Sequence, residues 1–247
     1  DSCNMSEHMA FESLTVLDLT RVLAGPFCTM MLADMGANVI KIEVPKGGDD
    51  TRSYPPFRAK NLNGERESVY FANINRNKKG ITLNLKAPEG KEIFKELVKK
   101  ADIVVENYRP GVMDKLGLGY DVLKEINPRI IYAAVSGFGC YGPYHLRPGY
   151  DILAQAMGGM MSITGSKGGE PTRAGSALGD ILGGLHVTIG ILAAVNARTI
   201  TGKGQRVDVS LMDSMIAATE NTALKYIETG NIPAPMGCLL YTSPSPR

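Results

Sequence analysis

The chain has 247 residues, of which 44% are hydrophobic, a length that permits one large domain or two small ones. Its 27 Lys and Arg residues nearly balance its 25 Asp and Glu residues, so the overall charge gives no argument for nucleic acid or a membrane surface as a partner. The longest apolar stretch, residues 181–195, is interrupted by glycines and a histidine and is shorter than a bilayer-spanning helix. We therefore expect no nucleic-acid partner and no membrane.

The four cysteines are scattered along the sequence, at Cys3, Cys28, Cys140 and Cys238. Without a Cys-x-x-Cys pair they fit neither a disulfide framework nor a structural zinc site, so we expect free thiols in a reducing compartment. The three histidines are too few and too scattered for a metal cluster. The N-terminal residues lack the basic-then-apolar order of a signal peptide. These features predict a cytoplasmic protein without a bound metal.

Short apolar runs alternate with helical periodicity through the first part of the chain. This pattern predicts strands at residues 14–20, 38–44, 81–85, 102–108 and 129–138. Between them it predicts a polar, proline-bearing loop at residues 45–67, and helices at residues 25–35, 88–101 and 120–126. Such alternation is typical of an α/β fold with a doubly wound, mostly parallel, Rossmann-like sheet. Ligands of such sheets bind at the carboxyl ends of the strands.

The second part of the chain has a helical character. One short strand is predicted at residues 205–211, and helices at residues 150–161, 180–199 and 212–230. We expect an N-terminal extension over residues 1–13 and one large domain over residues 14–230. Residues 231–247 are expected to begin a linker to a truncated second domain, with a foreign tail from residue 238 onward.

The turn after the first predicted strand argues against a dinucleotide cofactor. Residues 20–27 read TRVLAGPF, with a single glycine followed by proline. The dinucleotide fingerprint G-x-G-x-x-G needs its glycines for the tight bend and for the close approach of the pyrophosphate. Neither a P-loop nor a Gly-x-Ser-x-Gly nucleophile motif occurs in the chain. The predicted sheet is therefore enzyme-like but carries none of the usual cofactor signatures.

Asp180 is one carboxylate at the start of a long apolar, glycine-spaced segment. It has two interpretations. A carboxylate at a helix start is usually an N-cap that satisfies free backbone amides, and those amides would hold it ionised. The other interpretation is a carboxylate nucleophile that forms a covalent acyl intermediate. The neighbouring Gly179, Gly183 and Gly184 serve either close packing or the approach of backbone amides to a developing oxyanion.

Six segments, in order along the chain, carry a resemblance to a known family: VLDLTRVLAGP (16–26), GANVIKIE (36–43), NRNKKG (75–80), DIVVENYRPG (102–111), RPGYD (147–151) and TGKGQRVD (201–208). Together they resemble the class III CoA-transferases, also called the CaiB/BaiF type. That family includes formyl-CoA:oxalate, carnitine and succinyl-CoA:dicarboxylate CoA-transferases. The family's nucleophile is the aspartate of a Gly-Asp pair before a glycine-rich helix, and the resemblance places it at Asp180.

The resemblance implies a reaction in which coenzyme A moves from an acyl-CoA donor to a carboxylic acid acceptor. The aspartate forms first a mixed anhydride with the donor acyl group and then an aspartyl-CoA thioester. Covalent steps of this kind divide one difficult exchange into easier ones. They imply coenzyme A or acyl-CoA as substrate and no tightly bound cofactor, and they require that water be kept out of the site.

The family's coenzyme A contacts carry over residue by residue. The loop of Arg21, Val22, Leu23 and Ala24 is expected to lie along the adenine and ribose. The remaining contacts are expected from Leu83, Lys86, Asn107, Tyr108, Arg109, Lys115, Arg147 and Tyr150. One position departs from the family, because Val44 stands where some members have an arginine. Lys46 or Arg52 is the expected substitute for that phosphate contact.

Two alternatives to the transferase remain open. The related alpha-methylacyl-CoA racemase uses a histidine and an aspartate to exchange an α proton, and its histidine takes the place of Tyr150. His145 is nearby, but we interpret it as a loop residue, and the transferase is preferred. The second alternative is a non-catalytic CoA-binding fragment. For the full-length protein the resemblance implies an interlocked homodimer, with an acyl-CoA and a small carboxylic acid as its ligands.

Overall fold

A computed structural model of the chain describes residues 8–58, 64 and 66–237. The foreign tail expected from residue 238, and the cysteines Cys3 and Cys238, lie outside these residues. Cys28 and Cys140 are free, as expected. Phe11 packs against the core, and its backbone amide donates to the carbonyl of Met35, so this part of the N-terminal extension is folded onto the domain.

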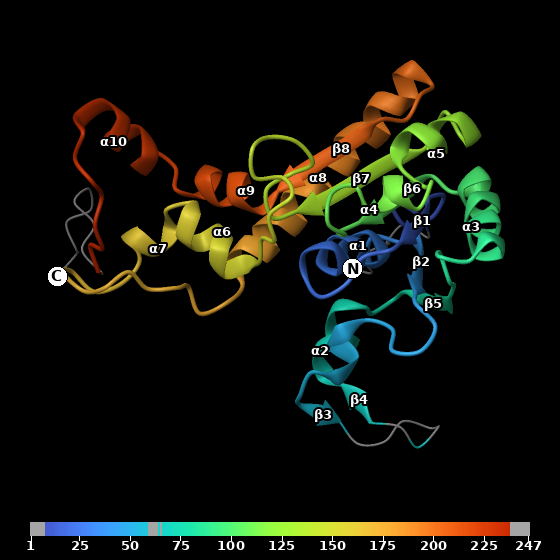
Figure 1. Ribbon diagram of the computed structural model, residues 1–247, viewed down its shortest axis with the longest axis horizontal. Helices are drawn as coiled ribbons and strands as arrows, with labels where there is room; N and C mark the ends of the chain where they lie inside the picture. The colour runs from blue at the N-terminus through green and yellow to red at the C-terminus, as the bar shows by residue number, and fades with distance from the viewer. Residues whose placement is uncertain (1–7, 59–63, 65, 238–247) are drawn as a thin grey trace, which may run out of the picture.

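Six parallel strands form the central sheet, in the order β5-β2-β1-β6-β7-β8 (Figure 1). They span Thr15–Asp18 (β1), Asn38–Glu43 (β2), Lys79–Thr82 (β5), Ile103–Glu106 (β6), Ile131–Ser136 (β7) and Arg206–Ser210 (β8). From β1 the chain adds strands first toward β5 and then, after returning to the middle, toward β8. This is the strand order of the doubly wound dinucleotide-binding fold, with its topological switch point between β1 and β6. The predicted fold class is confirmed.

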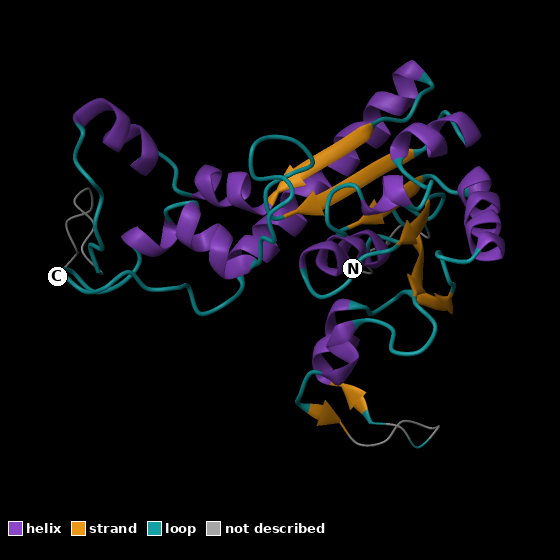
Figure 2. Cartoon of the chain, viewed as in Figure 1, coloured by secondary structure: helices purple, strands orange, loops and turns teal. Residues whose placement is uncertain are grey.

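Helices cover both faces of the sheet and create two cores (Figure 2). On one face lie α1 (Ala24–Asp34) and α8 (Leu178–Thr201), and on the other lie α3 (Pro88–Lys100), α4 (Val112–Lys115) and α5 (Tyr120–Ile126). Side chains of β6 alternate between the two cores, since Ile103 and Val105 face α1 and α8 whereas Val104 faces α3. A strand buried on both faces reads as a continuous apolar run, which is why the sequence revealed it.

The helix α8 packs closely because glycines line its buried side. A Cβ atom at Gly184 would lie 2.8 Å from the carbonyl oxygen of Ala24, and one at Gly190 would lie 2.6 Å from Val207. The helix has 24 residues, more than the apolar run in the sequence. Within the described part of the chain it alone is long and apolar enough to cross a membrane, by length and composition. Its contacts with α1, β7 and β8 are those of a core helix in this fold.

The predicted loop at residues 45–67 is wrong in part, because it contains the first elements of an arm that continues beyond it (Figure 1). The arm contains η1 (Asp50–Ser53), the two-stranded β3 (Phe57–Arg58) and β4 (Glu67–Ser68), and α2 (Val69–Ile74). Ser68 caps α2 by accepting the amide of Phe71 at 3.2 Å. Each element is too short to show a period, so sequence patterns did not reveal the arm.

Buried ion pairs fasten the two ends of the arm to the sheet, through Asp49 just before η1 and Lys78 after α2. Lys78 Nζ lies 3.1 Å from Asp18 Oδ2, and Lys41 Nζ lies 2.8 Å from Asp49 Oδ2. Burial acts to raise the pKa of Asp18, but the charges of Lys78 and Lys41 outweigh it and lower the pKa. Because charged groups without water need paired partners, these contacts fix the ends of the arm relative to β1 and β2.

Two predicted helices are interrupted in the structure. The first is divided into α6 (Asp151–Met157) and α7 (Met160–Ile163), because Gly159 takes a left-handed conformation between them. The second is divided into α9 (Leu211–Ala218) and α10 (Thr222–Thr229), with Glu220 left-handed at the break. Figure 1 shows α7 and α10 extending away from the sheet.

Candidate active site

A cavity of about 340 Å³ opens at the carboxyl edge of the sheet, beside the switch point. The loops after β1, β6 and β7 line it, the last of which runs to α6, together with the first turns of α8 and α9. A doubly wound sheet opens here because the chain leaves β1 and β6 in opposite directions, which separates their loops. The volume lies within the range of small-molecule sites, although it is smaller than a whole coenzyme A requires.

Asn107 joins the two loops at the switch point. Its Oδ1 accepts the backbone amide of Arg21 at 2.8 Å, and its Nδ2 donates to the backbone carbonyl of Arg21 at 2.6 Å. One side chain thus satisfies both polar groups of that residue, as a neighbouring strand would. The loop after β1 is held in place without the glycines of a dinucleotide site.

Glu106 supports the same loop from inside the core. Its carboxylate accepts the backbone amide of Tyr108 at 2.8 Å and the hydroxyl of Tyr132 at 2.9 Å. Burial raises the pKa of Glu106 to about 7, because the two hydrogen bonds and the charge of Arg206 offset the loss of solvent only in part. This role was not predicted from the sequence, since it depends on a contact between neighbouring strands.

Asp180 lines the cavity from the first turn of α8, and it is not the helix cap. The N-cap residue is Ala177, which has no capping side chain. The carboxylate of Asp151 replaces it, accepting the amide of Gly179 at 2.7 Å and that of Asp180 at 3.4 Å. The N-cap interpretation of Asp180 is therefore wrong. Its carboxylate remains available to the cavity.

The charge environment of Asp180 also differs from the sequence expectation. Burial and the nearby charge of Asp151 raise the pKa of Asp180 to about 7. We expected the helix amides to hold this carboxylate ionised, but Asp151 occupies the amides and adds a repulsive charge. A desolvated carboxylate with a raised pKa is more basic than one in water. Perturbed carboxylates in cavities are candidates for nucleophiles and bases.

Most of the predicted CoA contacts come together around this cavity. Those that line it are Arg21, Val22, Leu23, Ala24, Asn107, Tyr108, Arg109, Arg147 and Tyr150. Three others lie elsewhere: Leu83 packs against the core on the α3 face, while Lys86 and Lys115 are exposed outside the cavity lining. For these three a contact with coenzyme A stays a prediction.

The residues suggested as substitutes for the missing arginine have other surroundings. Arg52 makes a double hydrogen bond to Glu43, at 2.8 and 2.6 Å, and stacks on the ring of Phe71. Lys46 is exposed and borders a shallow hollow next to the cavity. Arg21 borders both spaces, so it is the residue that connects them.

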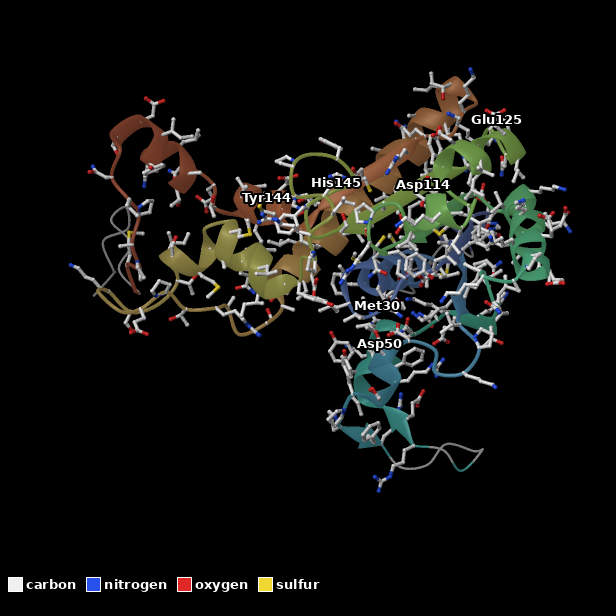
Figure 3. All side chains as sticks on the ribbon, viewed as in Figure 1. Met30, Asp50, Asp114, Glu125, Tyr144 and His145 are labelled. Atoms are coloured by element: carbon white, nitrogen blue, oxygen red, sulfur yellow. The ribbon has the colours of Figure 1, made fainter. Side chains whose placement is uncertain are left out.

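His145 lies in a loop, as expected, and it is also part of the cavity lining. Figure 3 shows His145 and Tyr144 in the loop between β7 and α6. Its Nδ1 lies 2.7 Å from the carbonyl oxygen of Gly142, and this contact fixes the ring. Ser136, at the end of β7, lines the cavity too, and its buried hydroxyl has no hydrogen-bond partner within the described residues.

The glycines beside Asp180 serve packing. A Cβ atom at Gly183 would come within 2.3 Å of Leu211, and one at Gly179 within 3.1 Å of the Asp151 carboxylate. The amide of Gly179 is already bonded to Asp151. The site therefore leaves that amide no free capacity for an oxyanion.

Residues 11–245 match the family described as CoA-transferase family III. The chain belongs to that family. The resemblance read from the six segments is thereby confirmed, and the comparisons with individual family members agree.

Relatives and a solved structure show how much of a family member this chain represents. The chain is 48% identical to the acetyl-CoA:oxalate CoA-transferase of Acetobacter aceti, over 92% of its own length and 57% of the relative. It is 45% identical to the human succinyl-CoA:glutarate CoA-transferase, over 91% of its length and 50% of the relative. A crystal structure of a CaiB/BaiF family protein from Brucella suis superposes with a TM-score of 0.89 at 44% identity, covering 94% of this chain and 61% of the other. The chain thus spans about half the length of the curated relatives it matches.

Proposed function

We propose that the whole protein transfers coenzyme A from an acyl-CoA to a carboxylic acid, with Asp180 as the covalent nucleophile. One observation carries the proposal: the Asp180 carboxylate faces the switch-point cavity, and no described residue donates a hydrogen bond to it. A nucleophile must have a free electron pair directed at the substrate, which a capping carboxylate lacks. Because Asp151 caps the helix, the Asp180 carboxylate is available to attack a substrate.

The reaction balances without a redox partner. An oxygen of Asp180 attacks the thioester carbonyl, and the C–S bond breaks. This step releases the CoA thiolate and forms an aspartyl–acyl anhydride. The thiolate then attacks the aspartyl carbonyl, which releases the donor acid and forms an aspartyl-CoA thioester. The acceptor carboxylate attacks this thioester, its C–S bond breaks, and an aspartyl–acceptor anhydride and free CoA thiolate result. The thiolate finally attacks the acceptor carbonyl of that anhydride, which forms the acceptor acyl-CoA. Asp180 is regenerated as a carboxylate, and no proton is gained or lost overall.

Cationic side chains around the cavity support an anionic ligand of the size of coenzyme A. Arg21, Arg109 and Arg147 line the cavity, and Arg21 also borders the hollow beside Lys46. The cavity holds only part of a coenzyme A, so the phosphates must extend beyond it. We propose that the pantetheine arm enters the cavity toward Asp180, while the phosphates lie past Arg21 along that hollow.

We propose dicarboxylic acids as the acceptors. The names of the oxalate and glutarate CoA-transferases, both nearly half identical to this chain, support this substrate class. In the cavity, Arg147 and His145 are the groups that suit a second carboxylate.

The proposed activity is tested with the whole protein, using succinyl-CoA and a panel of short dicarboxylic and monocarboxylic acids. We expect new acyl-CoA products from dicarboxylic acids, and a loss of at least about a thousandfold in the Asp180→Asn variant. Turnover that survives this substitution would contradict the nucleophile assignment.

A second candidate function rests on His145. Because this histidine lines the same cavity as Asp180, a histidine–aspartate pair for α-proton exchange is a specific alternative. Exchange of the α hydrogen of a 2-methylacyl-CoA for deuterium, without transfer of coenzyme A, would favour it. Binding of coenzyme A with neither reaction would favour the non-catalytic alternative.

We further propose that the whole protein is a homodimer in the cytoplasm. Apolar side chains are exposed on α8, at Leu185 and Ile189, and on α10, at Leu224 and Ile227. Exposed apolar faces of this kind are typical of surfaces covered by more protein. The free thiols of Cys28 and Cys140 fit a reducing compartment.

A further inference from the structure

One glutamine joins the segments that meet at the start of α8. Gln155 lies in α6 and is fully buried. Its Nε2 donates to Asp151 Oδ2 at 2.9 Å and to the carbonyl of Ser176 at 3.3 Å, and its Oε1 accepts the amide of Ala174 at 2.9 Å. Gln155 therefore ties α6 to the segment that leads into α8.

The orientation of this side chain is fixed by its partners. A backbone amide only donates, and a backbone carbonyl or an ionised carboxylate only accepts, so Oε1 and Nε2 of Gln155 cannot exchange places. The two oxygens of Asp151 also have separate partners: Oδ2 binds Gln155, and Oδ1 accepts the amides of Gly179 and Asp180. A rotation of the Gln155 amide would break every contact that this side chain makes.

The burial of this pair makes it more than an ordinary helix contact. A glutamine and an aspartate one turn apart often pair on a helix surface, where the contact contributes little to stability. Here Asp151 is only 8% exposed and Gln155 is 0% exposed. Because a buried polar group without a partner is costly, neither side chain can readily leave the other. The pair is a rigid support for the cap of α8.

Asp151 is the charge through which this support reaches Asp180. Burial and the charge of Asp151 together raise the pKa of Asp180. Burial, with the charges of Asp180 and Asp151, raises the pKa of Tyr70 on α2 to about 12, so this hydroxyl stays neutral. The other charged or titratable side chains that line the cavity are Arg21, Tyr108, Arg109, His145, Arg147 and Tyr150.

We propose that Gln155 is a positioning residue for the nucleophile: it holds the Asp151 carboxylate against the first turn of α8 and fixes the segment that enters this helix, so that Asp180 keeps its place in the cavity. This inference rests on the proposed function, in which Asp180 is the nucleophile. Gln155 is not among the residues that line the cavity, so it acts through Asp151 and not on the substrate.

Gln155→Met keeps the length of the side chain and removes all three hydrogen bonds. The Asp151 carboxylate is then free to leave the start of α8, and the helix start is free to shift. In the whole protein we expect kcat to fall roughly tenfold with little change in KM, because a misplaced nucleophile slows the covalent step. The repulsion of Asp180 weakens, so the rise of kcat/KM with pH should move to lower pH.

An exchange of the two side chains tests the pairing itself. Gln155→Glu alone places one acceptor against another, so kcat should fall by a similar factor. Combined with Asp151→Asn, the new amide at position 151 can donate to the new carboxylate and still accept the amide of Gly179. We expect this double variant to recover at least about threefold in kcat over Gln155→Glu.

Asn127→Leu is the matched control for the loss of a bridging amide. Asn127 also joins backbone groups of separate segments, since it donates to the carbonyls of Val98 and Ala101, and it lies outside the cavity lining. Its replacement should lower the midpoint of thermal unfolding but leave kcat and the pH profile unchanged.

Unchanged kcat and an unchanged pH profile in Gln155→Met would overturn the inference. If that variant does not fold, the exchange decides, and no recovery over Gln155→Glu would overturn the inference instead. Failure of the unmodified whole protein to transfer coenzyme A would overturn the proposed function together with it. Equal transfer by the unmodified protein and by both single variants at Gln155 would overturn the role of Gln155 alone.

Discussion

Asp151 caps the helix on which Asp180 stands: the Asp151 carboxylate accepts the amide of Gly179 at 2.7 Å and the amide of Asp180 itself at 3.4 Å. This contact has two effects on Asp180. It satisfies the helix start, so that the Asp180 carboxylate need not, and it places a second negative charge nearby, which contributes to raising the pKa of Asp180 to about 7. Gln155 holds Asp151 in place, donating to its Oδ2 at 2.9 Å.

Replacing Asp151 by asparagine should change the pH dependence of transfer. The amide oxygen of Asn still accepts the Gly179 amide, but the repulsive charge is gone, so the pKa of Asp180 falls. Because the ionised carboxylate is the nucleophile, the rise of the rate with pH, centred near pH 7, should move to lower pH. The pH profile of kcat/KM in the whole protein is the measurement.

Asp151→Ala is the matched control for this change. It removes both the charge and the cap, so we expect the same shift of the profile together with a loss of stability of about 1 kcal/mol. An unchanged profile in both variants would mean that Asp151 does not influence the ionisation of Asp180.

Asp180→Asn should stabilise the chain in a pH-dependent way. The folded-state pKa of Asp180 lies above its unfolded value, so the contribution of Asp180 to folding stability is fully present below about pH 4 and is lost as the pH rises through about 7. Asparagine does not titrate, so the variant avoids this loss. We expect the free energy of unfolding to increase by about 2 kcal/mol at pH 8 and by little at pH 4. The increase at pH 8 is smaller than the full pKa shift implies, because Asp180 is partly exposed.

Chemical denaturation of the two proteins at pH 4, 6 and 8 measures this difference. Glu106 also titrates near pH 7 and is unchanged in the variant, so its contribution cancels in the comparison. A gain that is equal at all three pH values would contradict the raised pKa of Asp180.

Lys78→Met should destabilise the chain strongly. Lys78 is the direct partner of the buried Asp18, and its ammonium also donates to the Pro26 carbonyl at 3.1 Å. Removal leaves a buried carboxylate without its nearest cation, which costs about 3–5 kcal/mol. Unfolding in denaturant measures this loss of unfolding free energy. Adding Asp18→Asn to Lys78→Met should restore part of the loss, and no restoration would show that the pairing is not the cause.

Gly184→Ala should disturb the packing of α8 on α1. A Cβ atom there would lie 2.8 Å from the backbone oxygen of Ala24, which cannot move without shifting α1. We expect a loss of about 1–3 kcal/mol in unfolding free energy. Gly183→Ala provides the comparison, because its new Cβ meets the flexible end of the Leu211 side chain. A larger loss at Gly183 than at Gly184 would contradict this packing argument.

The centre of the sheet was predictable because β1, β6 and β7 are buried almost throughout. Residues 103–106 are all apolar or core-facing, and such runs are visible without knowledge of the fold. The break at Gly159 also had a local signal, two adjacent glycines, although the prediction continued the helix through it.

The features missed from the sequence depend on contacts between distant residues. Asp151 and Gly179 are 28 residues apart, and their hydrogen bond decides that Asp180 is not the cap. The arm likewise depends on the pairing of Lys78 with Asp18, which no periodicity reveals. The position of His145 in the cavity follows from how its loop returns across the sheet edge. Local patterns predict elements, whereas these contacts exist only in the folded chain.

Asp180 is proposed to carry the covalent intermediates, and peptide mass spectrometry tests this assignment most directly. The whole protein is incubated with an acyl-CoA, quenched in acid and digested. We expect a coenzyme A or acyl adduct on the peptide that contains Asp180, at Asp180 itself, and none in the Asp180→Ala variant. An adduct at another residue, or full turnover with no adduct on this peptide, would contradict it.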